Sequence, residues 1–452
     1  MSKAVIQDFT QGELFRPMLK FSIPFMLSNA FQVFYSMTDM IIVGQFVGKQ
    51  GIAAVMSGGF LVMFIMMIGL GLATGGQVLV SQLIGKNERH RLNSAIGTLI
   101  SMNLAAAGIM AAAAVILAPT VLRWMNTQAE AFASTQDYLV ICGGGVVFIY
   151  VYNALSAILR GVGDSVRPFV FIVASAAVNI LLDLLMVALW DWGVAGAAVA
   201  TVISQAAAMF MAIYYMYIKR KEFELSFSLG TLRWQRDVLW ALLKLGIPFS
   251  VRFAAINVSM IFVVSLINSL GVAAAAAFGI ALRLDELANK ISQGVMMAVS
   301  TIVGQNIGAG RIDRIRKGVY YAWSICGGFF LFFGLLLFFF PDKMFALFTD
   351  DESVLELAPL IVSALLLHYP ALLIMKGTNG FVQGIGNALF GLIIALLDGV
   401  VCRIFFSWFF GVALNMGLYG MVLGYSLATY STALPNLFYF LFVPWYKRKT
   451  VI

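Results

Sequence analysis

Charge is scarce in this sequence. Only 11% of its 452 residues are Asp, Glu, Lys or Arg, well below the roughly 25% of a soluble domain, and 61% are hydrophobic. A soluble protein is therefore excluded. Three cysteines are present, Cys142, Cys326 and Cys402, and none stands in C-x-x-C spacing, so we expect neither a disulfide nor a metal site. The sequence also lacks a P-loop and a nucleophile–base pair, so we expect no enzymatic activity and no cofactor.

Long uncharged runs take the place of the missing charges, for example at 50–85, 92–118 and 318–341. A membrane span needs about 20 apolar residues, and the alternating pattern of barrel strands is absent. We therefore predict an all-α polytopic membrane protein with twelve transmembrane helices. The predicted spans are 19–46, 52–84, 94–118, 137–159, 168–190, 194–218, 240–268, 274–306, 317–340, 356–381, 388–411 and 418–443.

The chain also repeats itself, with a nearly constant offset in residue number of 223 or 224. The matches are LKFSIPF (19–25) with LKLGIPF (243–249), VSQLIGKNERHR (80–91) with VGQNIGAGRIDR (303–314), RGVGD (160–164) with QGIGN (383–387), and WGVAG (192–196) with MGLYG (416–420). This pattern predicts two six-helix lobes related by internal duplication, 1–218 and 238–452, joined by a cytoplasmic linker at 219–237. In so apolar a chain it is typical of a two-lobed transporter.

Lysine and arginine predict the orientation. Alternate loops hold only Lys49, Arg123 and Lys343, whereas the other loops and both ends of the chain hold twenty. Because cytoplasmic loops are the basic ones, we expect both termini in the cytoplasm and a multi-pass protein of the plasma membrane, in a prokaryote the inner membrane. The net charge of +8 then comes from the basic loops on the cytoplasmic side, and it indicates no nucleic-acid partner.

Few polar residues lie inside the predicted spans of the first lobe. Asp39 lies late in the first span, and Asn179 and Asp183 share one face of the fifth at i, i+4 spacing. Asn153 lies in the fourth span and Thr201 in the sixth. No lysine or arginine lies well inside these spans. Acids in a membrane are costly and mark ion or proton pathways, so these residues predict a proton or cation site. The alternative for Asp39 is a wet position near the outer surface.

These features resemble the MATE (multidrug and toxic compound extrusion) family of the MOP superfamily. The resemblance rests on IPF in spans 1 and 7, TDMIIVGQ, the Q-x-x-G ends of spans 2 and 8, LRGVGD, NILLD and WGVAGAAVAT. It implies an antiporter that exports amphipathic drugs or metabolites in exchange for H+ or Na+, by alternating access in the lipid bilayer. We expect it to act as a monomer.

The resemblance is closer to the DinF-like than to the NorM branch. It implies a first-lobe cation or proton site at Asp39, Asn153, Asn179, Asp183 and Thr201, and a bend of the first helix at Pro24. NorM-type members carry acids in spans 7 and 10. The corresponding stretches here, RFAAINVSM and LHYPALLIMKGTNG, contain none. H+ is therefore the expected ion. Na+ at Asp39 and Asp183 stays open, because carboxylate and amide oxygens also bind hard cations.

The second lobe has a different polar set. Arg283, Asp285, Glu286 and Lys376 are candidates for contact with the substrate, or else members of an ion cluster that orders the lobe. Two other functions stay open. A MOP-superfamily flippase for lipid-linked sugars would share the fold and the repeat, but should lack the Asp39, Asn179 and Asp183 set. A channel is less compatible with the repeat and the buried acids.

Overall fold

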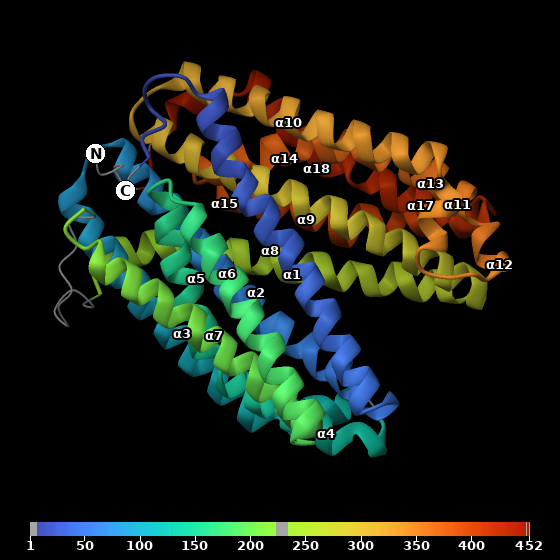
Figure 1. Cartoon of the computed structure of the whole chain (residues 1–452). Coiled ribbons are helices and arrows are strands. Elements are labelled where there is room, and N and C mark those ends of the chain that lie inside the picture. Colours follow the sequence, from blue (N-terminus) through green and yellow to red (C-terminus); the bar gives the residue numbers. More distant parts are fainter. Residues whose placement is uncertain (1–6, 126, 223–233, 449, 452) are drawn as a thin grey trace. The chain divides into compact units, whose positions relative to one another are not determined.

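The computed structural model describes residues 7–125, 127–222, 234–448 and 450–451, without the side chains of residues 49 and 255–258. In these residues the secondary structure is helical and contains no strand (Figure 1). The first copy forms α1 (Phe15–Phe46), α2 (Lys49–Gly85), α3 (Arg89–Trp124), α4 (Ala129–Gly144), α5 (Val146–Gly161), α6 (Val166–Asp183), the π-helical η1 (Leu184–Leu189) and α7 (Gly193–Ile218).

The second copy follows the same order, with more interruptions. It forms α8 (Arg236–Asn268), α9 (Val272–Gly308), α10 (Ile312–Phe339), α11 (Pro341–Ala346), α12 (Glu352–Leu355), α13 (Ala358–Leu365), α14 (His368–Gly384), α15 (Ala388–Leu396), the π-helical η3 (Leu397–Cys402), α16 (Arg403–Trp408), the π-helical η4 (Phe409–Ala413), α17 (Gly417–Ala428) and α18 (Tyr430–Phe442); a short turn, η5 (Trp445–Lys447), ends it.

Each of the twelve predicted spans coincides with one helix or with a set of consecutive helices. By length and hydropathy alone, seven helices in the described residues can cross a membrane, and two bent pairs raise that number to nine. The pairs are α4–α5, bent by 43°, and α13–α14, bent by 46°. α9 is outside this group; it carries four charged residues between Arg283 and Lys290, which lower its hydropathy.

The backbone of the turns repeats as the sequence does. Apart from Gly12, each described residue with a positive φ has a counterpart at the repeat-related position of the other copy. The pairs are Gly48 with Gly271, Asn87 with Gly310, Gly163 with Gly386, Asp191 with Asn415, and Gly193 with Gly417. Positive φ is adopted most readily by Gly, and these residues lie in the turns between helices or at helix ends. The predicted internal duplication is confirmed in the geometry of the turns.

The chain forms two compact units whose bounds differ from the bounds of the repeat. Unit 1 is mainly Leu27–Ser250, and unit 2 comprises Phe9–Met26 and Val251–Thr450. α1 therefore belongs to unit 2 up to Met26 and to unit 1 from there on, and α8 changes from unit 1 to unit 2 after Ser250. The predicted division into 1–218 and 238–452 follows the repeat and stays a prediction. Most of the predicted linker lies outside the described residues.

α1 and α8 each pass from one unit to the other, and in each helix the last residue before that passage packs against a glycine. Within unit 1, the backbone of Ser250 packs against Gly71 of α2. Within unit 2, the backbone of Met26 packs against Gly294 of α9. The two glycines occupy repeat-related positions, so the duplication has preserved the contact. A side chain at either glycine would collide with the opposing backbone, and only glycine permits so close an approach.

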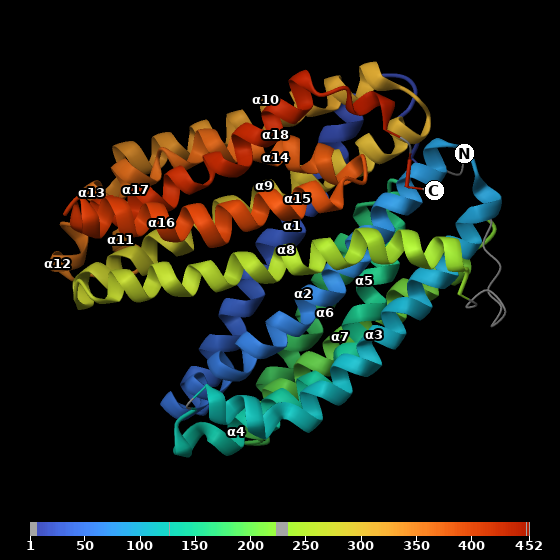
Figure 2. The ribbon, with the colours of Figure 1, turned by 180° about the vertical axis from the view of Figure 1, so that it is seen from behind.

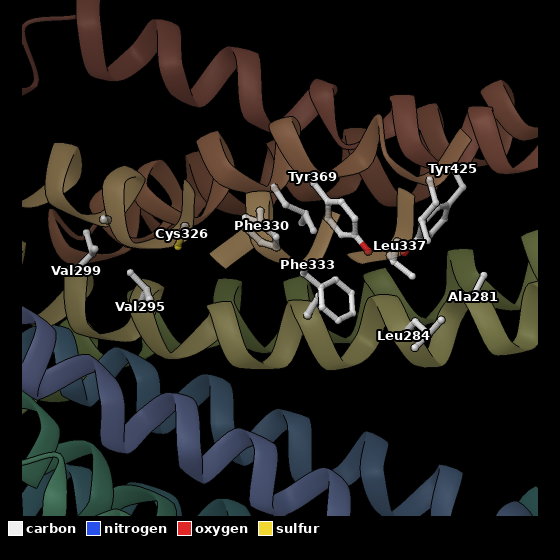
Figure 3. Close-up of a cluster of buried hydrophobic side chains, with 14 of the residues drawn as sticks. Ala281, Leu284, Val295, Val299, Cys326, Phe330, Phe333, Leu337, Tyr369 and Tyr425 are labelled. Atoms are coloured by element: carbon white, nitrogen blue, oxygen red, sulfur yellow. The ribbon is translucent and has the colours of Figure 1, made fainter. Parts of the chain in front are cut away.

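Apolar side chains fill the interior of each unit. In unit 1, α3, α5 and α7 lie side by side (Figure 2) and bury Leu99 and Ile158. In unit 2, α9, α10 and α14 enclose the cluster in Figure 3, where the rings of Phe330 and Tyr369 stack with centroids 5.5 Å apart. Polar side chains buried in such surroundings need partners, because an unmade hydrogen bond is costly there.

Candidate functional site

Two carboxyl groups meet in the interior of unit 1. Asp39 comes from α1, Asp183 is the last residue of α6, and their side chains lie within hydrogen-bonding reach of each other. Because carboxylates only accept hydrogen bonds, a bond between the two requires a proton on one of them. In the described part of the chain no arginine, lysine or histidine forms an ion pair with either acid. The pair can therefore hold a proton between its oxygens.

Asn179 lies one turn before Asp183, as the i, i+4 spacing predicted, and both side chains are fully buried. Asp39 Oδ1, both carboxylate oxygens of Asp183 and both polar atoms of the Asn179 amide have no hydrogen-bond partner among the described residues. A buried polar atom left in this way costs about 1–3 kcal/mol. This set of oxygens is suited to a proton or to a small hard cation.

Three residues that the sequence analysis did not single out surround the acids. Tyr35 of α1 lies near both carboxyl groups, and its hydroxyl bonds to the side chain of Thr201 on α7. Tyr138 and Cys142 of α4 bond to each other and lie near Asp39. Tyr35 precedes Asp39 by four residues, so helical spacing could have indicated it. Tyr138 and Cys142 come from a separate helix, and no local pattern relates them to the acids.

The helix geometry changes immediately after Asp183. α6 ends there and continues as η1, a segment with the wider i→i+5 turn of a π-helix. Such turns are uncommon and concentrate at functional sites.

The remaining predicted residues lie elsewhere. Asn153 is half-buried on α5. Pro24 lies within α1, which runs unbroken from Phe15 to Phe46.

The four candidates of the second lobe are in three different environments. Arg283 and Glu286 are exposed and form an ion pair at 3.2 Å. Asp285 is on the buried face of α9, where it accepts a hydrogen bond of 2.9 Å from the Tyr425 hydroxyl. Lys376 is buried. Its ammonium group donates to the Asn289 side chain, to the Asn289 carbonyl at 3.2 Å, and to Gln293 at 3.3 Å, so it is bonded to α9. These residues do not form one polar wall.

A second ionic group in unit 2 lies at the junction of η3 and α16. Arg403 Nη2 bonds to Asp398 Oδ1 at 3.1 Å, and both side chains are at most one-tenth exposed. The Thr432 hydroxyl donates to the other Asp398 oxygen at 3.0 Å, and the guanidinium lies 5.0 Å from the centre of the Tyr425 ring. In contrast to the acids of unit 1, this carboxylate has its own cation.

A family model described as MatE matches residues 24–185 and 248–409, which is well over half of the chain. The chain belongs to the MatE family. The two matches begin and end at repeat-related positions, as the internal duplication requires. Both acids of unit 1 lie in the first match, and the Asp398–Arg403 pair lies in the second.

Curated relatives cover nearly the whole MatE chain. The probable multidrug resistance protein YpnP of Bacillus subtilis (strain 168) is 28% identical over 427 residues, 94% of this chain and 95% of the relative. The probable multidrug resistance protein NorM of Thermotoga maritima is 24% identical over 446 residues, 97% and 95% of the two chains. The multidrug export protein MepA of Staphylococcus aureus (strain MRSA252) is 25% identical over 402 residues, 87% and 86%.

Solved structures share the fold. A MOP superfamily transporter from Pyrococcus furiosus, with a binding pocket described as of reverse polarity, superimposes with a TM-score of 0.92 at 22% identity, covering 99% of this chain and all of the other. An outward-facing multidrug resistance MATE family transporter matches with the same TM-score, identity and coverage. The predicted twelve-helix membrane fold and the predicted family are thereby confirmed. The choice between the DinF-like and NorM branches stays a prediction.

Proposed function

We propose that this chain is a secondary active efflux transporter, an antiporter that exports amphipathic organic compounds in exchange for H+ by alternating access. The observation that carries the proposal is the pair of acids without a cation, the half-buried Asp39 and the buried Asp183. A carboxyl pair that can hold a proton binds it from one side of a membrane and releases it to the other. The multidrug names of its relatives support organic export, and membership of the MatE family supports transport as the activity in place of enzymatic catalysis.

The proposed site consists of Asp39, Asn179, Asp183 and Thr201, and Tyr35 joins it as the residue that links Thr201 to the acids. Asn153 of α5 stays in the proposal as a cation-binding residue, on the resemblance given above. H+ is favoured over Na+, because the second-lobe acids of the NorM branch are absent from spans 7 and 10. Na+ at the same oxygens is the alternative.

The second lobe enters the proposal in a narrower form. Arg283 and Glu286 are exposed, so they can contact an incoming compound. Lys376 is bonded to α9, so we propose that it positions the Asn289 and Gln293 side chains and does not bind substrate itself.

We also retain the proposals of cytoplasmic termini, a prokaryotic inner membrane location and a functional monomer. The flippase alternative has no comparable support, because an uncompensated acid pair is unsuited to an anionic lipid-linked sugar.

The test is dye uptake into inverted membrane vesicles with an acid lumen and no Na+. A total proton driving force of about 150 mV gives roughly 3.4 kcal/mol per H+, enough for a gradient of a few hundred-fold for a neutral compound. We expect a lipophilic dye to accumulate and a protonophore to release it. Uptake that requires Na+ would refute H+ coupling, and uptake that follows neither ion gradient would refute antiport.

A further inference from the structure

A histidine and an aspartate oppose each other in the apolar core of unit 2, away from the acids described above. His368 is the first residue of α14, and Asp285 is on the buried face of α9; their side chains are 2% and 3% exposed. His368 Nε2 and Asp285 Oδ1 are 3.7 Å apart, and neither atom has a hydrogen-bond partner among the described residues. Two orphaned polar atoms thus oppose each other across a distance that one proton can bridge.

The other ring nitrogen shows where the neutral imidazole carries its proton. His368 Nδ1 lies 3.0 Å from the Thr429 hydroxyl, and the ring also bonds to the backbone carbonyl of Ser426, one turn earlier on α17. A carbonyl only accepts, so the nitrogen on this side carries the hydrogen. In the neutral ring Nε2 is then a bare acceptor that points toward a carboxylate oxygen. A proton added to Nε2 satisfies both atoms and creates an ion pair.

Asp285 has no other cation of its own. Its second oxygen accepts from the Tyr425 hydroxyl at 2.9 Å, and the described residues contain no ion pair to Asp285 except the one with His368. Arg403 acts on Asp285 from a distance but is bonded to Asp398. A buried carboxylate without a cation costs several kcal/mol, and the imidazolium is the group placed to offset that cost.

The charged and titratable groups around the pair come from several helices. Tyr369 follows on α14 and Tyr425 lies on α17, as Figure 3 shows for both rings. The charged groups that act on the pair or on its neighbours are Arg252 of α8, Lys290 of α9, Lys376 of α14, Asp398 of η3 and Arg403 of α16. The charges of Asp398 and Arg403 cancel. Protonation of His368 adds one positive charge to the cluster.

We propose that His368 and Asp285 form a proton-binding site in unit 2, in which one proton is held on His368 Nε2 as an ion pair with Asp285. The proton comes from a hydronium ion of the solvent: one O–H bond breaks and leaves water, and one N–H bond forms at the Nε2 lone pair. The site lies at the break between α13 and α14, where the two helices meet at 46°. Proton binding therefore ties the start of α14 to α9, and proton loss leaves two acceptors opposed at that break.

Nuclear magnetic resonance of the histidine rings tests this directly, since the chain has only two. His90, exposed at the start of α3, is the internal reference, and its signals are assigned by His90→Asn. In the full-length protein in nanodiscs we expect the His368 ring to be neutral at about pH 8 and to gain one proton, on Nε2, as the pH falls. A His368 ring that stays neutral from about pH 5 to pH 8 overturns the proposal.

Asp285→Asn removes the opposing charge with little change in shape. Removal of an opposite charge within about 4–6 Å weakens proton binding tenfold or more, so protonation of His368 should move to lower pH by about one unit or more. The matched control is Glu286→Gln, the adjacent residue on the exposed face of α9, which should leave His368 unchanged. Equal effects of the two variants would contradict the site. If Asp285→Asn does not fold, the titration of the unmodified protein still decides.

The inference goes beyond the proposed function and does not rest on it. The measurement reads the charge of one ring and needs no transport. A failure of pH-driven dye uptake would refute the proposed antiport and leave the His368 result standing. A neutral His368 would refute the second proton site and leave the role of Asp39 and Asp183 untouched.

Discussion

The acid site of the first copy has no duplicate in the second. At the repeat-related positions, the second copy has a valine, a hydroxyl and a guanidinium in place of the two carboxyl groups and the amide. The turns and the glycine contacts are nevertheless the same in both copies. The equivalent pairs, all at the same offset, are Asp39 and Val263, Asn179 and Arg403, Asp183 and Ser407, and Thr201 and Tyr425. Duplication preserved the scaffold, and the chemistry then diverged.

A single inserted residue accounts for part of that divergence. The offset is 223 at Gly163 and Gly386 but 224 at Asp191 and Asn415, so the second copy gains one residue in between. The π-helical η3 lies in this interval at positions where the first copy has regular α6, whereas the second π segment, η4, is equivalent to η1. A π turn closes at i+5 and so accommodates one more residue than an α turn. Asp398 lies in η3 and reaches Arg403 at that i+5 spacing.

The contrast indicates which copy can exchange a proton at this position. In the second copy Asp398 is bonded to Arg403 and to Thr432, so its charge is compensated within the protein. In the first copy Asp39 and Asp183 have only each other. A compensated carboxylate stabilises one arrangement of helices, whereas an uncompensated pair responds to protons. Four sets of substitutions test this contrast.

The largest effect is expected for Asp183→Asn. It removes the acid that pairs with Asp39 but keeps the size and the polar atoms of the side chain. We expect export to fall to the background level, because one carboxyl alone no longer shares a proton. Stability should be unchanged or higher, since a buried charge is lost. Dye efflux and thermal unfolding are the measurements. Asp191→Asn, the same exchange in an exposed turn, should transport normally, and full export by Asp183→Asn would remove the proposed site.

The reverse pattern is expected for the ion pair of the second copy. Arg403→Gln and Asp398→Asn should each destabilise the protein by about 3–5 kcal/mol, because each leaves a buried charge without its partner. The double variant should cost less than the sum of the two. Reversible unfolding in mixed micelles measures all three. Additive losses would show that the two residues do not act as a pair, and the contrast with Asp183 would fail.

The glycine contacts test whether the two copies are alike in their scaffold. Gly71→Ala should force the added methyl group into the backbone of Ser250, and Gly294→Ala into that of Met26. We expect similar losses of about 1–3 kcal/mol from both. Gly59→Ala and Gly279→Ala are the controls on the same helices, where an added methyl group meets open space. They should be neutral or stabilising. A loss at only one of the two contacts would show that the duplication no longer preserves this feature.

The sequence predicted what depends on regular spacing. Hydropathy located the spans, motif matches located the repeat, and α-helical spacing placed Asn179 and Asp183 together. It did not predict the Asp398–Arg403 pair, because residues five apart diverge on an α-helix and converge only in the π turn. Nor did it predict the surroundings of His368, whose partners come from α9 and α17, far away in the chain. Contacts between distant helices leave no local pattern in the sequence.

The smallest effect is expected for Asp164→Asn, because the second copy already has an asparagine at the equivalent position. Asp164 caps α6 through the backbone nitrogens of Val166 and Arg167, and it accepts from the Tyr215 hydroxyl at 3.2 Å. Its counterpart in the second copy is Asn387, which donates to the Tyr439 hydroxyl at the same distance. Because Asn forms this contact in the second copy, we expect Asp164→Asn to fold and to differ from the parent by less than about 1 kcal/mol near pH 7.

The difference should depend on pH in one direction. Burial raises the pKa of Asp164 above its usual range, against the hydrogen bonds from Arg167 and Tyr215 that lower it. The folded protein therefore retains this proton at a pH where the unfolded chain, with a pKa of about 3.9, has released it. The stability that the proton contributes is present at low pH and is lost as the pH rises through the folded pKa. Unfolding temperatures at about pH 4 and about pH 7 measure it. Relative to Asp164→Asn, the parent should be more stable at about pH 4 than at about pH 7. A relative stability that increases toward pH 7 would contradict the raised pKa of this carboxyl.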